Sequence, residues 1–116
     1  MICELITLFG RLDIVIRSAD LNFLCVIENK VDASEQVDQL LRYSRWMETQ
    51  LEGYSSQALI YLSIHGDPAY TAQGVPYLRL SYRRDIARWL EQTLSEIEAP
   101  NVRGVVEQYR NLVRIL

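Results

Sequence analysis

One lysine and two acidic residues are the side chains whose types and spacing predict chemistry in this chain. Lys30 is the only lysine, because every other fixed positive charge is an arginine. Glu28 precedes it by two positions, and Asp13 lies in an earlier apolar run. Carboxylate oxygens are the ligands that Mg²⁺ and Mn²⁺ prefer. Because a bound divalent ion lowers the pKa of water, Asp13 and Glu28 predict a metal site for hydrolysis.

Lys30 and its neighbour Asn29 complete this candidate site. We expect the Lys30 ammonium to orient a bound water, to help deprotonate it, or to stabilise negative charge that develops during the reaction. The backbone carbonyl of Asn29 is a further candidate oxygen ligand for the metal. Such a set suits phosphodiester hydrolysis. Glu-x-Lys alone is a weak motif, however, and often marks only the solvated edge of a strand.

The chemistry requires these side chains to come from adjacent strands. Three apolar runs predict three strands, at residues 2–9, 11–17 and 21–27. Residues two apart on a strand point to one face, so Glu28 and Lys30 should lie together. The alternation in 11–17 places Asp13 and Val15 on one face, opposite Leu12.

The remainder of the chain predicts helices around this sheet. Asp32 and Glu35 match a capping box, and the helix after them should end at Gly53 and bury Val37, Leu40, Leu41, Ser44, Met47 and Leu51. A strand at 58–64 implies a parallel crossover. A short strand and two helices follow, at 78–82, 84–97 and 102–115. The prediction is one α/β domain over residues 1–116, a mixed sheet flanked by helices with core order βββαβ.

These residues together resemble a known family. Asp13, Glu28-Asn29-Lys30 and the segment Gln39-Leu40-Leu41-Arg42-Tyr43 look like the PD-(D/E)xK nuclease superfamily, whose fold is restriction-endonuclease-like. The Gln-x-x-x-Tyr spacing resembles the branch with RecB-like and Cas4-like nucleases, in particular its bacterial members. The resemblance implies a metal-dependent DNA nuclease that uses Mg²⁺ or Mn²⁺.

The resemblance also implies roles for individual residues. Asp13 and Glu28 match the metal ligands, and Lys30 matches the catalytic lysine. Gln39 and Tyr43 match positions that support the site and touch the nucleic-acid backbone. Members usually carry a helix before the first strand. Here the first strand begins at the second residue, so we expect a minimal or truncated domain.

Composition limits the other classes of function. The net charge of −3 over 116 residues argues against a protein that coats nucleic acid by bulk charge, but it permits a local patch. No run approaches the ~18 apolar residues of a membrane span. Cys3 and Cys25 lack a metal-type spacing and predict buried thiols in a reducing compartment, so we expect a cytoplasmic location.

Several alternatives stay open from the sequence. His65 follows a strand and is either structural or faces the site. Four arginines near the C-terminal helices either contact phosphates or, because Asp85 and Glu91 interleave with them, form a salt-bridged helix face: Arg79, Arg83, Arg84 and Arg88. The fold is also compatible with a non-catalytic nucleic-acid-binding module or an assembly domain, in which the C-terminal helices pair in a homodimer.

Overall fold

The computed structural model describes residues 2–7, 10–31, 38–70 and 72–116, and the side chains from residue 12 onward within these ranges. The predicted capping box of Asp32 and Glu35, and the predicted buried Val37, lie outside the described residues. Within the described residues, no helix is long and apolar enough to cross a membrane.

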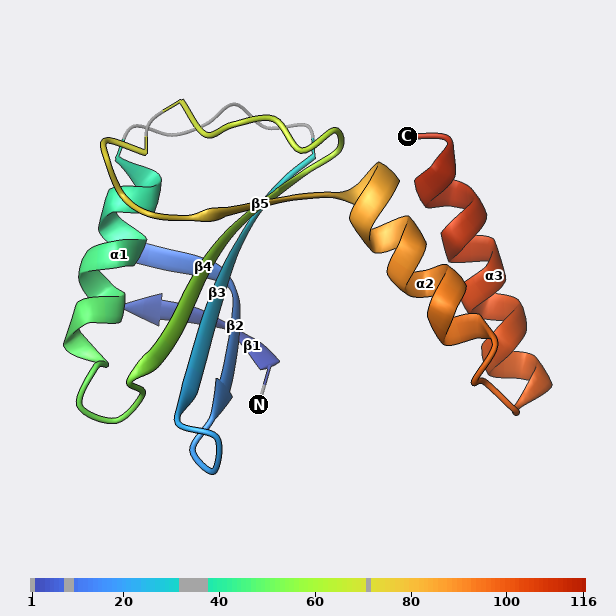
Figure 1. The fold of residues 1–116 in the computed structure, drawn as a ribbon, viewed down its shortest axis with the longest axis horizontal. Coiled ribbons are helices and arrows are strands. Elements are labelled where there is room, and N and C mark those ends of the chain that lie inside the picture. Colours follow the sequence, from blue (N-terminus) through green and yellow to red (C-terminus); the bar gives the residue numbers. More distant parts are fainter. Residues whose placement is uncertain (1, 8–9, 32–37, 71) are drawn as a thin grey trace.

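One mixed sheet of five strands forms the centre of the molecule, in the order β1-β2-β3-β4-β5 (Figure 1). The first three strands are antiparallel: β1 (Ile2–Thr7), β2 (Gly10–Ser18) and β3 (Phe23–Lys30). The last two, β4 (Ser56–Ser63) and β5 (Leu78–Ser81), add in parallel. This confirms the predicted α/β class and the core order βββαβ of a restriction-endonuclease-like fold.

Helix α1 (Gln39–Thr49) covers one face of the sheet and forms the main core with it (Figure 1). Its buried residues recur at helical spacing: Gln39, Leu40, Tyr43, Trp46 and Met47. The prediction was right for Leu40 and Met47, whereas Leu41 and Ser44 are only half-buried. It was wrong for Leu51, which is 49% exposed, because the helix ends at Thr49 before this side chain can turn toward the sheet.

A bulge in β2 changes the predicted alternation around Asp13. Cys3 pairs with Val15 and Leu5 with Leu12, so two steps along β1 oppose three along β2. The extra residue places Leu12 and Val15 in the same core, and both are 0% exposed. The prediction of opposite faces for these two was therefore wrong. Bulges re-aim the side chains beside them, and this one lies at Asp13 and Ile14.

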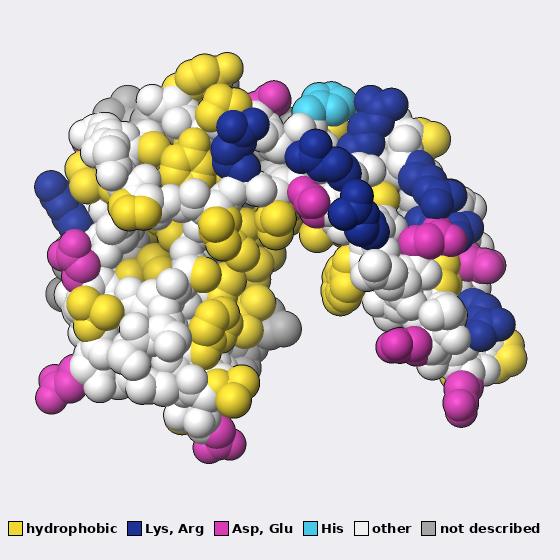
Figure 2. Space-filling model, in the orientation of Figure 1, with side chains coloured by type: hydrophobic (Ala, Val, Ile, Leu, Met, Phe, Trp, Pro, Cys, Tyr) yellow, Lys and Arg dark blue, Asp and Glu magenta, His cyan; other side chains and the backbone are white. Residues whose placement is uncertain are grey.

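A helical hairpin lies beside the sheet face opposite α1 (Figure 1). It begins with a π-helical turn, η1 (Tyr82–Ile86), and continues as α2 (Ala87–Leu94) and α3 (Pro100–Arg114). Ala87, Leu90 and Val113 form a small second core between its helices. Both predicted C-terminal helices are present, and the second begins at Pro100, two residues earlier than predicted. Figure 2 shows a hollow between hairpin and sheet, with hydrophobic side chains on the sheet side.

Candidate functional site

Glu28 and Lys30 lie on one face of β3, as their spacing predicted. Glu28 is 1% exposed, and its Oε1 lies 2.8 Å from Nζ of Lys30. The Lys30 side chain is 10% exposed and thus lies at the boundary between the core and solvent. This pair therefore places one charge inside the protein and presents the other at its surface.

Asp13 reaches the same strand from β2. The pairing of β2 with β3 runs only as far as Ile14 opposite Ile27. Just beyond it, the backbone N–H of Asn29 donates a hydrogen bond of 3.1 Å to Oδ2 of Asp13. The structure thus brings Asp13 beside β3 between Glu28 and Lys30. The N–H and C=O of one strand residue point to the same side, so the Asn29 carbonyl is also directed toward β2.

The environment of Glu28 disfavours its charged form. Burial raises the pKa of its carboxyl, and the negative charge of Asp13 raises it further, while the Lys30 ammonium and the Tyr43 hydroxyl act in the opposite direction. Neither Glu28 oxygen accepts a hydrogen bond of good geometry from the described residues. Buried polar atoms normally have partners, so this carboxylate is suited to receive a cation.

Tyr43 and Gln39 on helix α1 lie behind this carboxylate in the core. Tyr43 is 1% exposed and Gln39 is 7% exposed. The Gln39 side-chain amide donates a hydrogen bond of 3.0 Å to the Tyr43 hydroxyl oxygen. Burial and the neighbouring Glu28 raise the pKa of Tyr43. The Tyr43 hydroxyl therefore keeps its proton and can donate a hydrogen bond to Glu28. The structure thus places Tyr43 and Gln39 next to Glu28, while their supporting role and their contact with nucleic acid stay predictions.

A pocket of about 300 Å³ opens beside Lys30 at the carboxyl ends of β3 and β4. Its lining includes Tyr61, His65, Asp67 and Tyr70. The Ser63 hydroxyl accepts hydrogen bonds from the backbone N–H groups of Gly66 and Asp67, at 2.9 and 3.0 Å, and so holds the loop in place.

The sequence left the position of His65 open, and the structure places it in this pocket. The sequence prediction did not include Asp67 or Tyr70, although loops after parallel strands are a common position for binding residues.

A second link ties the site to the helical hairpin. The Tyr82 hydroxyl donates a hydrogen bond of 2.7 Å to Oδ1 of Asn29. The same Asn29 therefore accepts from η1 through its side chain and donates to Asp13 through its backbone. π-helical turns often occur at functional sites, and η1 begins at Tyr82. Sequence reasoning missed this residue, because nothing local relates it to β3.

The acidic groups present fit a hard divalent cation better than a soft one. Among the described residues, no group of three His, Cys, Asp or Glu side chains could hold a metal. Two carboxylates do come together, however, and apart from its ion pair with Lys30 the buried Glu28 carboxylate accepts no hydrogen bond of good geometry from the described residues. Hard ions such as Mg²⁺ are commonly held by one or two carboxylates while water completes their coordination.

Comparison with known proteins gives a family for this sequence pattern. A family model described as the PD-(D/E)XK nuclease superfamily matches residues 4–111. The match extends from β1 to the last turns of α3 and includes every residue of the site described above. No curated protein and no solved structure matches the chain.

Proposed function

The chain belongs to the PD-(D/E)XK nuclease superfamily, and from this premise we propose that it is a metal-dependent DNA nuclease with Asp13, Glu28 and Lys30 as catalytic residues. Nucleases of this superfamily generally use divalent metals. The observation that carries the proposal is the position of the Asp13 carboxylate, which is hydrogen-bonded to β3 between Glu28 and Lys30. The assignment to the RecB-like branch, the bacterial source and the cytoplasmic location stay predictions.

Asp13, Glu28 and the Asn29 carbonyl would hold the metal, Mg²⁺ or Mn²⁺. A divalent ion bound there would supply charge neutralisation at the phosphate and a water of lowered pKa. Apart from the Lys30 ammonium, no described group gives Glu28 a hydrogen bond of good geometry, so its oxygens can take a metal ligand role. Burial raises the pKa of the Glu28 carboxyl, and the positive charge of a bound cation would favour its ionised form. Metal affinity should therefore rise with pH.

Lys30 acts at the boundary between Glu28 and the pocket. Its ammonium lies 2.8 Å from Glu28, and its side chain also lines the pocket. A phosphate that enters the pocket would thus meet a positive charge already held in position. In this geometry Lys30 orients the attacking water and stabilises negative charge as it develops on the phosphate oxygens.

Gln39 and Tyr43 have a positioning role in this proposal. Gln39 orients the Tyr43 hydroxyl, and that hydroxyl lowers the pKa of Glu28. Their burial favours this role. Contact with the nucleic-acid backbone would be a second role, in which Gln39 is the better candidate because it is the more exposed of the two.

Cleavage of supercoiled plasmid DNA tests the proposal directly. The wild type should nick or linearise it with Mg²⁺ or Mn²⁺ and not with EDTA. Asp13→Asn and Glu28→Gln keep the size of each side chain and should lose this activity by at least about 10²-fold. Glu91→Gln, which removes an exposed carboxylate on α2, is the matched control. Equal activity in Glu28→Gln and Glu91→Gln would rule out the assigned site.

A homodimer is a second proposal, which a specific surface favours. One stripe of α3 carries exposed apolar side chains at alternating spacings of three and four residues, as in a coiled-coil seam: Val102, Val105, Tyr109 and Leu112. They are between 44% and 67% exposed. Pairing of this stripe with a second copy would remove it from water, and it would leave the nuclease site unchanged.

A further inference from the structure

Four arginines gather next to the pocket that Lys30 lines. They lie on consecutive elements, with Arg79 on β5, Arg83 and Arg84 on η1, and Arg88 on α2. All four side chains are exposed. Figure 2 shows Lys and Arg side chains gathered around the single histidine of the chain, at the upper end of the hairpin. This is a local positive surface on a protein of net negative charge.

The acidic residues that interleave with these arginines in sequence are engaged elsewhere. Asp85 accepts a hydrogen bond of 2.8 Å from the backbone N–H of Ser81. Glu91 pairs across the hairpin with Arg110 and Arg114, at 2.9 and 2.8 Å.

Within the part of the chain that the structure describes, none of the four arginines near the pocket forms an ion pair. Of the two readings that the sequence left open, the salt-bridged face therefore applies to α2 and α3 through Glu91, and not to these four residues.

Contacts with the loop at 64–67 connect the arginines to the candidate active site. Arg79 donates from Nε to the Gly66 carbonyl at 2.9 Å. The backbone N–H of Arg83 donates to the Ile64 carbonyl at 3.2 Å. Nη2 of Arg84 lies 3.5 Å from where a Cβ on Gly66 would be. The same loop carries His65 into the pocket beside Lys30.

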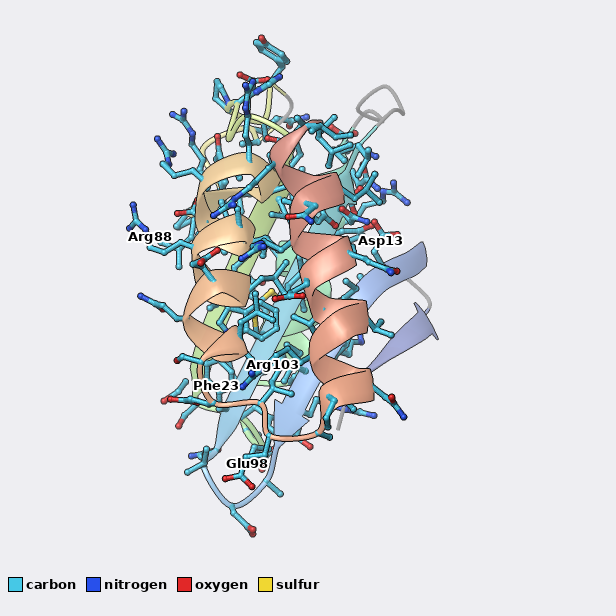
Figure 3. The ribbon with its side chains drawn as sticks, turned by 90° about the vertical axis from the view of Figure 1, so that its right-hand side faces the viewer. Asp13, Phe23, Arg88, Glu98 and Arg103 are labelled. Carbon is cyan, nitrogen blue, oxygen red and sulfur yellow. The ribbon has the colours of Figure 1, made fainter. Side chains whose placement is uncertain are left out.

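The positive surface continues from this loop along the hairpin. Arg84 and Arg88 are four residues apart, which places their side chains on one side of a helix. Figure 3 shows Arg88 projecting from α2 on the side away from α3. The surface thus runs from Lys30 past His65 to Arg88 without an intervening ion pair among the described residues.

We propose that Arg79, Arg83, Arg84 and Arg88 form a phosphate-binding track, which holds the DNA backbone on one side of the bond that is cut. The proposal rests on the nuclease function and adds the path that the bound DNA follows from the active site across the protein surface. Unpaired arginines are suited to phosphate oxygens, which they contact through several N–H donors at once. Because the protein as a whole is negative, this local track would supply most of its attraction for DNA.

Salt-dependent binding of labelled duplex DNA tests the track, measured by anisotropy in EDTA so that no cleavage occurs. The test variant is Arg83→Gln/Arg84→Gln/Arg88→Gln. Each lost phosphate contact should reduce the slope of log affinity against log salt by about 0.9, and the affinity at low salt should fall at least about tenfold. Arg79 is left in place, because its hydrogen bond to Gly66 holds the loop.

The matched control removes the same number of charges from the other helix of the hairpin. Arg103→Gln/Arg110→Gln/Arg114→Gln acts on residues that already have partners in Ile97 and Glu91, so its slope should equal that of the wild type. Equal slopes in all three proteins, or an equal reduction of the slope in both triple variants, would contradict the proposal that these arginines form a phosphate-binding track. Tighter binding of a duplex RNA of the same sequence would overturn the choice of DNA.

A small substrate separates this proposal from the nuclease function. Thymidine 5′-(p-nitrophenyl phosphate) fills the site but is too short to reach the arginines, so the test variant should cleave it at the wild-type rate. If no protein cleaves DNA while the slopes still differ, the nuclease function fails and the track stands. If the wild type cleaves DNA and the slopes are equal, only the track fails. Should the triple variant not fold, Arg88→Gln alone must still lower the slope by about 0.9.

Discussion

The Asp13 carboxylate and the backbone N–H of Asn29 are joined by a hydrogen bond of 3.1 Å, at the point where the pairing of β2 with β3 ends. The Asp13 side chain thus accepts a hydrogen bond from β3 at the position where backbone pairing between the two strands has ended. The bulge in β2 provides the extra residue that makes this possible. In consequence, Asp13 is held beside the strand that carries Glu28 and Lys30.

Lys30→Ala should lose DNA cleavage and keep DNA binding. Its ammonium is assigned to charge that develops only during the reaction, so its loss should cost about 10²–10³-fold in kcat. Lys30→Arg should not restore the rate, since a guanidinium is planar and does not replace a compact ammonium. Single-turnover cleavage together with anisotropy measures both effects. Substantial cleavage by Lys30→Ala would exclude a catalytic role.

Mn²⁺ should bind at Asp13 and Glu28. Calorimetric titration of the wild type should show one site, which Glu28→Ala weakens at least about tenfold, because one of two carboxylate ligands is gone. Glu91→Ala serves as the control, since that carboxylate lies on α2 and pairs with Arg110 and Arg114. Unchanged affinity in Glu28→Ala would place the metal elsewhere.

Tyr43→Phe should shift the pH dependence of metal binding to higher pH. The hydroxyl of Tyr43 stabilises the charged form of Glu28 and lowers its pKa, so its removal raises that pKa further. Metal binding needs the ionised carboxylate, and the midpoint of affinity against pH should therefore rise. Tyr54→Phe is the matched control, because Tyr54 packs against the same core and is not among the groups that shift the pKa of Glu28. An identical pH profile for Tyr43→Phe and wild type would contradict this role.

Glu28→Gln should stabilise the fold at neutral pH in the absence of metal. Burial raises the pKa of Glu28 above its unfolded value, so the folded state binds the proton more tightly. This contribution is complete below the unfolded pKa and disappears as pH rises through the folded pKa. A neutral amide avoids that loss. A gain of ~1 kcal/mol would raise the melting temperature by roughly 4 °C, and thermal unfolding between pH 4 and 8 checks it. A lower melting temperature of Glu28→Gln at pH 7 would contradict the destabilising effect assigned to the buried Glu28 charge.

The α3 stripe should hold a homodimer together. Sedimentation equilibrium at micromolar concentration should give twice the mass of one chain, and Val105→Glu/Leu112→Glu should give a monomer that still unfolds cooperatively. Gln108→Glu adds a charge to the same helix outside the stripe and should leave the dimer intact. A wild-type monomer at these concentrations would remove the assembly proposal.

Local patterns in the sequence were enough for the features that depend on neighbouring residues. Glu28 and Lys30 share a face because successive strand residues alternate, whatever surrounds them. Gln39 and Tyr43 share a helix face because a turn has 3.6 residues. The order of strands and helices follows from the same two periods. For this reason the fold class was predicted correctly.

Tertiary structure alone decided the features that depend on distant partners. The face of Asp13 depends on a bulge, which arises from the register of β2 against β1 and leaves no signature within β2 itself. Tyr43 contacts Glu28 only because α1 packs over β3. Within the described ranges, the arginines near the pocket form no ion pair, and Glu91 pairs instead with Arg110 and Arg114 on α3. Local sequence fixes which way a side chain points along its own element, and packing between elements decides which charges it meets.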